Sequence, residues 1–241
     1  MSDSFVAWRG PSAFDGEPIV AIAVPKSTND KTGPMINVHI LRADMSPVDA
    51  MRSGSDQSIC WTCPLRGTLQ PDGSRAGRGC YVVYAQGPQS TWRANAHKPA
   101  VHPDEFLTLF RDADVRLGAY GEPAALPIDV VRNMLAPART WTCYTHRWPD
   151  FANTDGWRAI SMASVDSIAE ADEAEARGWR VYRYGEADTR RATEIVCPHE
   201  TRGVQCIDCG LCDGASSRRR GVKSILATPH GSGAKYLKIV Q

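Results

Sequence analysis

From about residue 103, short apolar segments alternate with amphipathic ones, and this alternation restricts the fold more than any other feature. Strands are predicted for "VRLGAY" (115–120), "TWTCYTH" (140–146), "WRAISMASV" (157–165), "WRVYRYG" (179–185), "TEIVC" (193–197) and "KSILATP" (223–229). Helices are predicted for residues 103–113, 127–138 and 167–178. Because these helices are long enough to cross over between parallel strands, the order predicts an α/β fold, a partial (β/α) barrel with mostly parallel strands.

The whole chain, residues 1–241, is predicted to be a single domain. Its length and its 42% of hydrophobic residues suit one substantial core. We expect an irregular N-terminal segment at 1–56, a cysteine loop at 57–100 and a β/α core at 101–241 that carries a C-terminal cysteine loop at 196–214. The short elements predicted in the first segment are β-like runs at 19–24 and 35–41 and a helix at 45–54.

Charge and hydropathy exclude several classes of partner. Charged residues make up 23% of the chain and the formal net charge is +1, so no overall attraction to nucleic acid or membrane is expected. No apolar run approaches the roughly 18–20 residues of a membrane span, and the first residues lack the layout of a secretory signal. A cytoplasmic location is therefore predicted, where eight cysteines favour metal binding or catalysis over disulfides.

Half of the cysteines form one compact group. Cys197, Cys206, Cys209 and Cys212 follow the pattern C-x8-C-x2-C-x2-C, and glycines within the stretch allow tight wrapping of the backbone. Zinc sites usually pair two C-x2-C knuckles, whereas one continuous C-x2-C-x2-C run is closer to the spacing that holds an iron–sulfur cluster. We therefore predict that these four thiolates bind one metal centre, an iron–sulfur cluster, with zinc as the alternative.

Three further cysteines form a second predicted site. Cys60, Cys63 and Cys80 give the pattern C-x2-C-x16-C around a glycine-rich loop. Three protein ligands with an open position are typical of a catalytic metal site, because a substrate or cofactor then binds the metal directly. The other possibility is a structural zinc site with a fourth ligand brought by the fold. The candidates for that ligand are Cys143, His97, His102 and His146. Cys143 stands alone in its strand and is predicted to be a core residue.

Polar and ligating residues follow several of the predicted strands. Glu122, His146, Cys197 and His230 each come at or just after a strand end, so a β/α fold is expected to gather them on one rim. Tyr144 and His146 alternate along one strand and face the same side. If that side is the interior, they are candidate catalytic residues for proton transfer or substrate orientation. If it is the exterior, Tyr144 is a packing residue and His146 is capped.

One stretch carries a resemblance to a known family. Downstream of the three cysteines, "VRLGAYGEPAALPIDVVRNMLAPARTWTCYTH" resembles a segment of radical S-adenosylmethionine enzymes, in which a strand ends in a Gly-Glu-Pro turn before a helix and another strand. Gly121, Glu122 and Pro123 match that turn. The resemblance covers roughly residues 60–160. The family's cluster motif is C-x3-C-x2-C, and this chain departs from it.

That resemblance implies a partial (β/α) barrel with a [4Fe–4S] cluster near its N-terminal end. It also implies that the turn at Gly121, Glu122 and Pro123 contacts the amino group of the cofactor's methionine. The C-terminal cysteines would then hold an auxiliary cluster. As a whole, the chain also resembles phage-encoded cysteine-rich proteins that share its "KTGPM", "LRADMSP", "CPLRG" and "YTH-x-W" stretches, for which replication-associated or radical-enzyme-like roles are named.

Two functions are therefore predicted. The first is a metal-cluster protein of radical S-adenosylmethionine type, acting in the cytoplasm of a host cell if phage-encoded. The alternative is a zinc-stabilised nucleic-acid-binding, replication-associated protein without catalysis. In this second reading the basic run that includes Arg218, Arg219 and Arg220 contacts phosphates.

Overall fold

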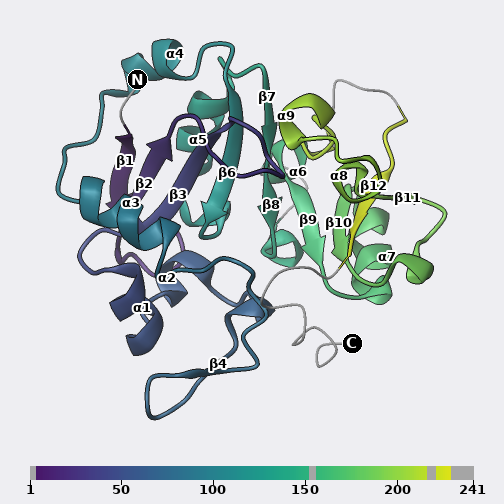
Figure 1. Cartoon of the computed structure of the whole chain (residues 1–241), viewed down its shortest axis with the longest axis horizontal. Coiled ribbons are helices and arrows are strands. Elements are labelled where there is room, and N and C mark those ends of the chain that lie inside the picture. The colour runs from purple at the N-terminus through teal and green to yellow at the C-terminus, as the bar shows by residue number, and fades with distance from the viewer. Residues whose placement is uncertain (1–3, 152–155, 216–220, 229–241) are drawn as a thin grey trace.

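The computed structural model of the chain describes residues 4–151, 156–215 and 221–228, which build two five-stranded β-sheets side by side and a small hairpin (Figure 1). The first sheet has the order β1-β2-β3-β6-β7. Its strands are β1 (Phe5–Pro11), β2 (Pro18–Val24), β3 (Ile36–Arg42), β6 (Asp114–Tyr120) and β7 (Thr140–Thr142). The first two pairings are antiparallel, and β3, β6 and β7 are parallel.

The second sheet is parallel throughout and has the order β11-β12-β10-β9-β8. Its strands are β8 (Tyr144–Thr145), β9 (Met162–Val165), β10 (Val181–Tyr184), β11 (Glu194–Val196) and β12 (Ser224–Ala227). The chain passes directly from β7 to β8 through the buried Cys143, so the two sheets are joined along one stretch of extended backbone. In the part of the chain that the structure describes, neither sheet closes into a barrel.

Helices and loops cover opposite faces of these sheets. The longer helices are α3 (Gly87–Asn95), α5 (Ile128–Leu135) and α7 (Ile168–Ala176), and the shorter ones are α1 (Pro47–Ser53), α2 (Gln57–Cys60), α4 (Phe106–Leu109), α6 (Trp157–Ile160), α8 (Pro198–Arg202) and α9 (Cys206–Cys209). Helix α7 packs on β9 and β10, and the apolar side of α5 joins the main core. In contrast, α8 packs beside β11 of the second sheet and α9 beside β7 of the first (Figure 1).

The face opposite α5 and α7, here called the inner face, is rich in polar and aromatic side chains. Register and alternation place on it Asn37, His39, Arg116, Thr142, Tyr144, Met162, Ser164, Tyr182 and Ile225. Strand residues between them, such as Val38, Val115 and Ala163, are fully buried on the helix-covered side. Burial on that side explains why these strands are recognisable from their apolar residues, although the inner face is polar.

The structure confirms a mixed α/β fold with parallel strands, and several boundaries differ from expectation. Residues 157–160 form α6 rather than the start of a strand, because buried Trp157 begins a turn closed by the Ser161 N–H on the Trp157 carbonyl. The helix expected at 103–113 is reduced to α4 after a 3-10 turn. Strand β12 lies between β10 and β11, so the strand order is not sequential as in a simple barrel. No helix among the described residues is both long and apolar enough to cross a membrane.

Candidate functional site

The first cysteine set lies in the loop that follows β3. Cys60 ends α2, and the Cys63 N–H donates to the Cys60 carbonyl at 3.0 Å, which closes the turn between the two thiols. The Cys80 N–H donates to the Leu65 carbonyl at 3.0 Å, so the third cysteine returns to the same turn. The hairpin of β4 (Thr68–Leu69) and β5 (Arg75–Ala76) therefore lengthens the sequence between Cys63 and Cys80 without moving them apart in space.

A buried carboxylate holds this loop together. Asp56 accepts from Arg66 at 2.7 Å and from Arg75 at 2.6 Å, and its side chain is only 5% exposed. Arg66 also donates to the Trp61 carbonyl at 2.6 Å, inside the Cys60–Cys63 turn. The two arginines tie the hairpin to the base of α2, so the position of the thiols is set by a network of charge-assisted hydrogen bonds.

The Gly-Glu-Pro turn lies directly beside this loop. Glu122 follows β6, and its N–H donates to the Ile59 carbonyl at 2.6 Å. The buried Glu122 carboxylate accepts the N–H of Ala124 at 3.3 Å and the N–H of His146 at 3.0 Å. Burial raises the pKa of Glu122 above its usual value, although the hydrogen bond from the Thr145 side chain, the His146 charge and the two N–H groups oppose the rise. Both carboxylate oxygens are thus used to hold the ends of β6 and β8 against each other.

His146 connects the first cysteine set to the next strand. Its Nε2 atom lies 3.5 Å from Asp166 Oδ2 and 3.2 Å from Ser164 Oγ, while the ring also contacts the Cys63 thiol. Burial disfavours the charged imidazolium, but the Cys63 thiol and the Asp166 carboxylate more than offset this, so the pKa of His146 is raised. Of the proposed fourth ligands, His146 is the one that the fold brings to these cysteines. His97 and His102 are exposed, and Cys143 is buried in the core.

Two thiols of this set, those of Cys60 and Cys80, favour the protonated form unless a cation joins them. Burial raises the pKa of Cys60, and the Asp56 carboxylate, Cys63 and Cys80 raise it further. Burial also raises the pKa of Cys80, which the Arg78 charge partly opposes. A thiolate is the form that binds metal, so metal binding here would release protons.

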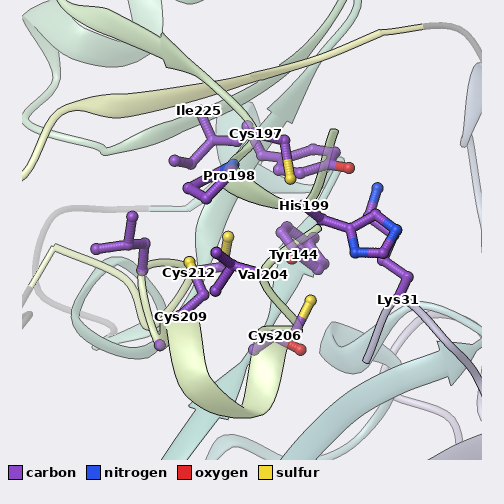
Figure 2. A pocket seen from close by; sticks show the side chains of 14 residues that line it. Lys31, Tyr144, Cys197, Pro198, His199, Val204, Cys206, Cys209, Cys212 and Ile225 are labelled. Carbon is purple, nitrogen blue, oxygen red and sulfur yellow. The ribbon is translucent and has the colours of Figure 1, made fainter. Parts of the chain in front are cut away.

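The second cysteine set gathers around one pocket on the inner face. Cys197 follows β11, Cys206 and Cys209 begin and end α9, and Cys212 comes shortly after. Figure 2 shows these side chains around a common space, together with Tyr144 from β8 and His199 from α8. The four cysteines thus line a single pocket.

Backbone hydrogen bonds fix this second loop onto both sheets. The Cys206 N–H donates to the Lys31 carbonyl at 2.9 Å, and the Ile207 N–H donates to the Thr32 carbonyl at 3.1 Å. The Cys143 N–H donates to the Cys212 carbonyl at 3.1 Å, at the junction of the two sheets. Burial raises the pKa of Cys212 to about 12, which the hydrogen bond to Tyr144 only partly opposes. Burial also raises the pKa of Cys206.

As the side chains are placed, no three His, Cys, Asp or Glu groups of the described residues are arranged to hold a metal ion. The metal ligands therefore stay predictions. The structure separates the two candidate catalytic residues: Tyr144 lines the pocket of the second cysteine set, whereas His146 lies beside the first cysteine set. Arg218, Arg219, Arg220 and His230 lie outside the described residues.

Sequence reasoning missed several groups at these sites. Asp166 follows β9 directly, so its place after a strand was a usable signal. Arg116 and Tyr182 lie within strands, where nothing in the local pattern distinguishes an inner-face residue from an exposed one. Comparison of the chain with known protein families, with curated proteins and with solved structures finds no match.

Proposed function

We propose that this chain is a metal-cluster enzyme of the radical S-adenosylmethionine type. The observation that carries the proposal is the meeting of Cys60, Cys63 and Cys80 with the turn at Gly121, Glu122 and Pro123 at the carboxyl ends of parallel strands. Ligand sites of α/β proteins form at this edge of the sheet. The finer architecture belongs to the same proposal: the two sheets, joined through β7 and β8, form one curved sheet, a partial (β/α) barrel.

In this proposal Cys60, Cys63 and Cys80 hold an iron–sulfur cluster with an open position for the cofactor. The bound cluster supplies a metal atom that the cofactor can ligate directly. Gly121 and Pro123 fix the turn beside it. Because the Glu122 carboxylate already accepts two N–H groups, its part is to hold the turn and the His146 backbone in place. The turn's contact with the cofactor amine then falls to its backbone carbonyls.

The second cysteine set is proposed as an auxiliary iron–sulfur site. Its four cysteines line one pocket, and burial raises the pKa of Cys206 and Cys212, an effect that a bound cation would reverse. Tyr144 reaches the Cys212 thiol from the sheet and is placed to orient a ligand there rather than to act with His146.

One observation favours zinc as the alternative metal at the first set. A metal-bound histidine usually has a carboxylate on its other ring nitrogen, and the His146 ring lies between Cys63 and Asp166 in that way. Three cysteines and one histidine then form a closed structural zinc site. With zinc at this site, the alternative function is a zinc-stabilised, nucleic-acid-binding protein. Its proposed phosphate contacts are Arg218, Arg219 and Arg220.

The deciding experiment is purification without oxygen, followed by iron, sulfide and zinc analysis and equilibrium binding of S-adenosylmethionine. We expect a brown protein that binds the cofactor. Cys63→Ala should lose cofactor binding yet keep the metal of the second set. Cys143→Ala, which removes a buried thiol outside both sets, is the matched control and should behave as the wild type. Zinc in both sites with no cofactor binding would end the enzyme proposal.

A further inference from the structure

Arg116 is a cation on the inner face without a carboxylate partner among the described residues. Its Nη2 donates to the hydroxyl of Tyr81, the residue after Cys80. The other groups that act on it electrostatically are Tyr144, Tyr182 and Cys206, all of which are ordinarily neutral. A half-buried guanidinium without a counter-charge is costly, and a bound anion offsets that cost.

The neighbours of Arg116 in the sheet have buried polar atoms without partners. Arg116 is in register with Asn37 on β3 and with Thr142 on β7, so the three side chains form a row across adjacent strands. The Asn37 Oδ1 and Thr142 Oγ1 atoms are buried with no hydrogen-bond partner, although Asn37 Nδ2 donates to Ser27. Buried polar atoms are normally satisfied, so orphaned ones in one row indicate a missing partner.

His39 extends this row along β3. It lies two residues beyond Asn37 on the same face, and its buried Nδ1 is also without a partner. Burial, assisted by the Arg116 charge, lowers the pKa of His39 to about 4, so the ring is neutral near pH 7. A neutral imidazole can donate or accept a hydrogen bond without repelling either charge.

We propose that Arg116, Asn37 and Thr142 bind the oxyanion end of a small substrate between the two cysteine sets. Arg116 supplies the positive charge, and its planar donors suit phosphate and carboxylate oxygens. Asn37 Oδ1 is an acceptor, so the ligand also carries an O–H or N–H close to its charge. Thr142 lines the pocket of the second set, and Tyr81 follows the last cysteine of the first. The bound oxyanion therefore lies within reach of both cysteine sets.

Thiolates of the second cysteine set do not account for these observations. Cys206 lies near enough to act on the Arg116 charge. A thiolate is only an acceptor, however, so it leaves Asn37 Oδ1 without a donor. The Arg116 hydrogen bond also goes to Tyr81, toward the first set rather than the second.

The test measures oxyanion binding to the full chain by calorimetry, at constant ionic strength set with sodium chloride. The probes are inorganic phosphate and glycolate, which each carry a hydroxyl, and acetate, which does not. The wild type should bind phosphate or glycolate saturably and acetate more weakly. Tighter binding of phosphate would indicate a phosphorylated substrate, and tighter binding of glycolate would indicate a hydroxy acid. Arg116→Gln should weaken binding about tenfold or more, the usual effect of losing a charged hydrogen bond. Arg111→Gln, at an exposed arginine, should not change it.

Thr142→Val provides a second variant that preserves the shape of the core. It removes an unpartnered buried hydroxyl, so the melting temperature should not fall while oxyanion binding weakens several-fold. Absence of saturable binding, or binding unchanged in both Arg116→Gln and Thr142→Val, would overturn the proposal; if Arg116→Gln does not fold, Thr142→Val decides. None of these measurements requires iron. A zinc protein that binds phosphate through Arg116 would keep this inference and end the proposed enzyme function.

Discussion

Glu122 shows how one buried carboxylate can position a whole rim. Its oxygens accept N–H groups from Ala124 and His146, and its own N–H holds Ile59. Glu122→Ala removes the acceptor of these N–H groups and of the Thr145 side chain, and we expect the free energy of unfolding to fall by about 1–3 kcal/mol. Urea unfolding measures this, with exposed Glu186→Ala as the control. Equal stabilities of the two variants would show that the carboxylate does not hold the rim.

His39 predicts a specific pH dependence of stability. Its pKa in the folded protein is lowered from 6.5 to about 4 by burial and by Arg116. Between these two values the unfolded chain binds a proton that the folded chain does not, so the free energy of unfolding falls as the pH is lowered. At about 1.4 kcal/mol per pH unit, the full loss is about 3 kcal/mol.

The measurement for His39 is the stability difference between the wild type and His39→Gln at several pH values. The difference should shift in favour of the variant from pH 6.5 down to pH 4, and it should be constant above pH 7.5. A difference that does not change over this range would mean that His39 titrates normally.

At the level of single residues, the sequence predicts cysteine groups better than it predicts their surroundings. The spacing of Cys197 to Cys212 is local, so the gathering of these side chains around one pocket follows from a short stretch of chain. The contact of His146 with Cys63 depends on the neighbouring strand ends of the fold, and the sequence left four candidates open. The role of Arg116 could not be predicted from the sequence, because it depends on which face of β6 the helices cover.

At the scale of elements, the turn after β6 requires glycine. Gly121 has φ +86°, and an added Cβ would lie 2.5 Å from the Ile40 carbonyl oxygen on β3. Gly16 has a similar φ of +79° but open space around it. Gly16→Ala should therefore cost about 1 kcal/mol for the backbone conformation alone. Gly121→Ala adds a clash with the backbone of β3 and should cost about 3 kcal/mol or more.

Thermal and denaturant unfolding of both glycine variants check this difference. Gly121→Ala should also reduce metal binding at the first cysteine set, because the loop after β3 contacts the same turn. Similar stability losses for the two variants would mean that the β3 backbone at Ile40 shifts at little cost to accommodate the added methyl group.

The elements that the sequence predicts well are those buried on one side by helices. Strands β9, β10 and β12 and helices α5 and α7 all appear within the expected ranges, and β6 begins one residue before its expected range. Strand β1 and helix α3 were not expected. Strand β1 contains the strand-favouring residues Phe5, Val6 and Trp8 but ends in Gly10 and Pro11, and it pairs with β2. Helix α3 lies within a stretch expected to be a cysteine loop. Their structure depends on tertiary contacts that no local pattern contains.

At the scale of the whole molecule, the two cysteine sets belong to segments far apart in the chain. The first set belongs to the loop after β3, and the second belongs to the segment after β11. The second segment also contacts the β2–β3 loop through Lys31 and Thr32. Metal at the second set would therefore connect the last part of the chain to the first.

This connection predicts a regional effect of metal removal. Backbone hydrogen bonds, a small apolar cluster and the Arg180 side chain, which donates to Asp213 and to the carbonyls of Leu211 and Gly214, hold residues 197–215 on the inner face. A bound metal should add to this stability. After treatment with a chelator, hydrogen exchange should accelerate strongly in 197–215 and in residues 30–33. Helix α5 packs on the other side within the main core, and its exchange should not change. Cys209→Ala should reproduce the chelator's effect without any chelator. Unchanged protection of 197–215 in both experiments would mean that the loop's own hydrogen bonds fix it and that the second set has no structural metal.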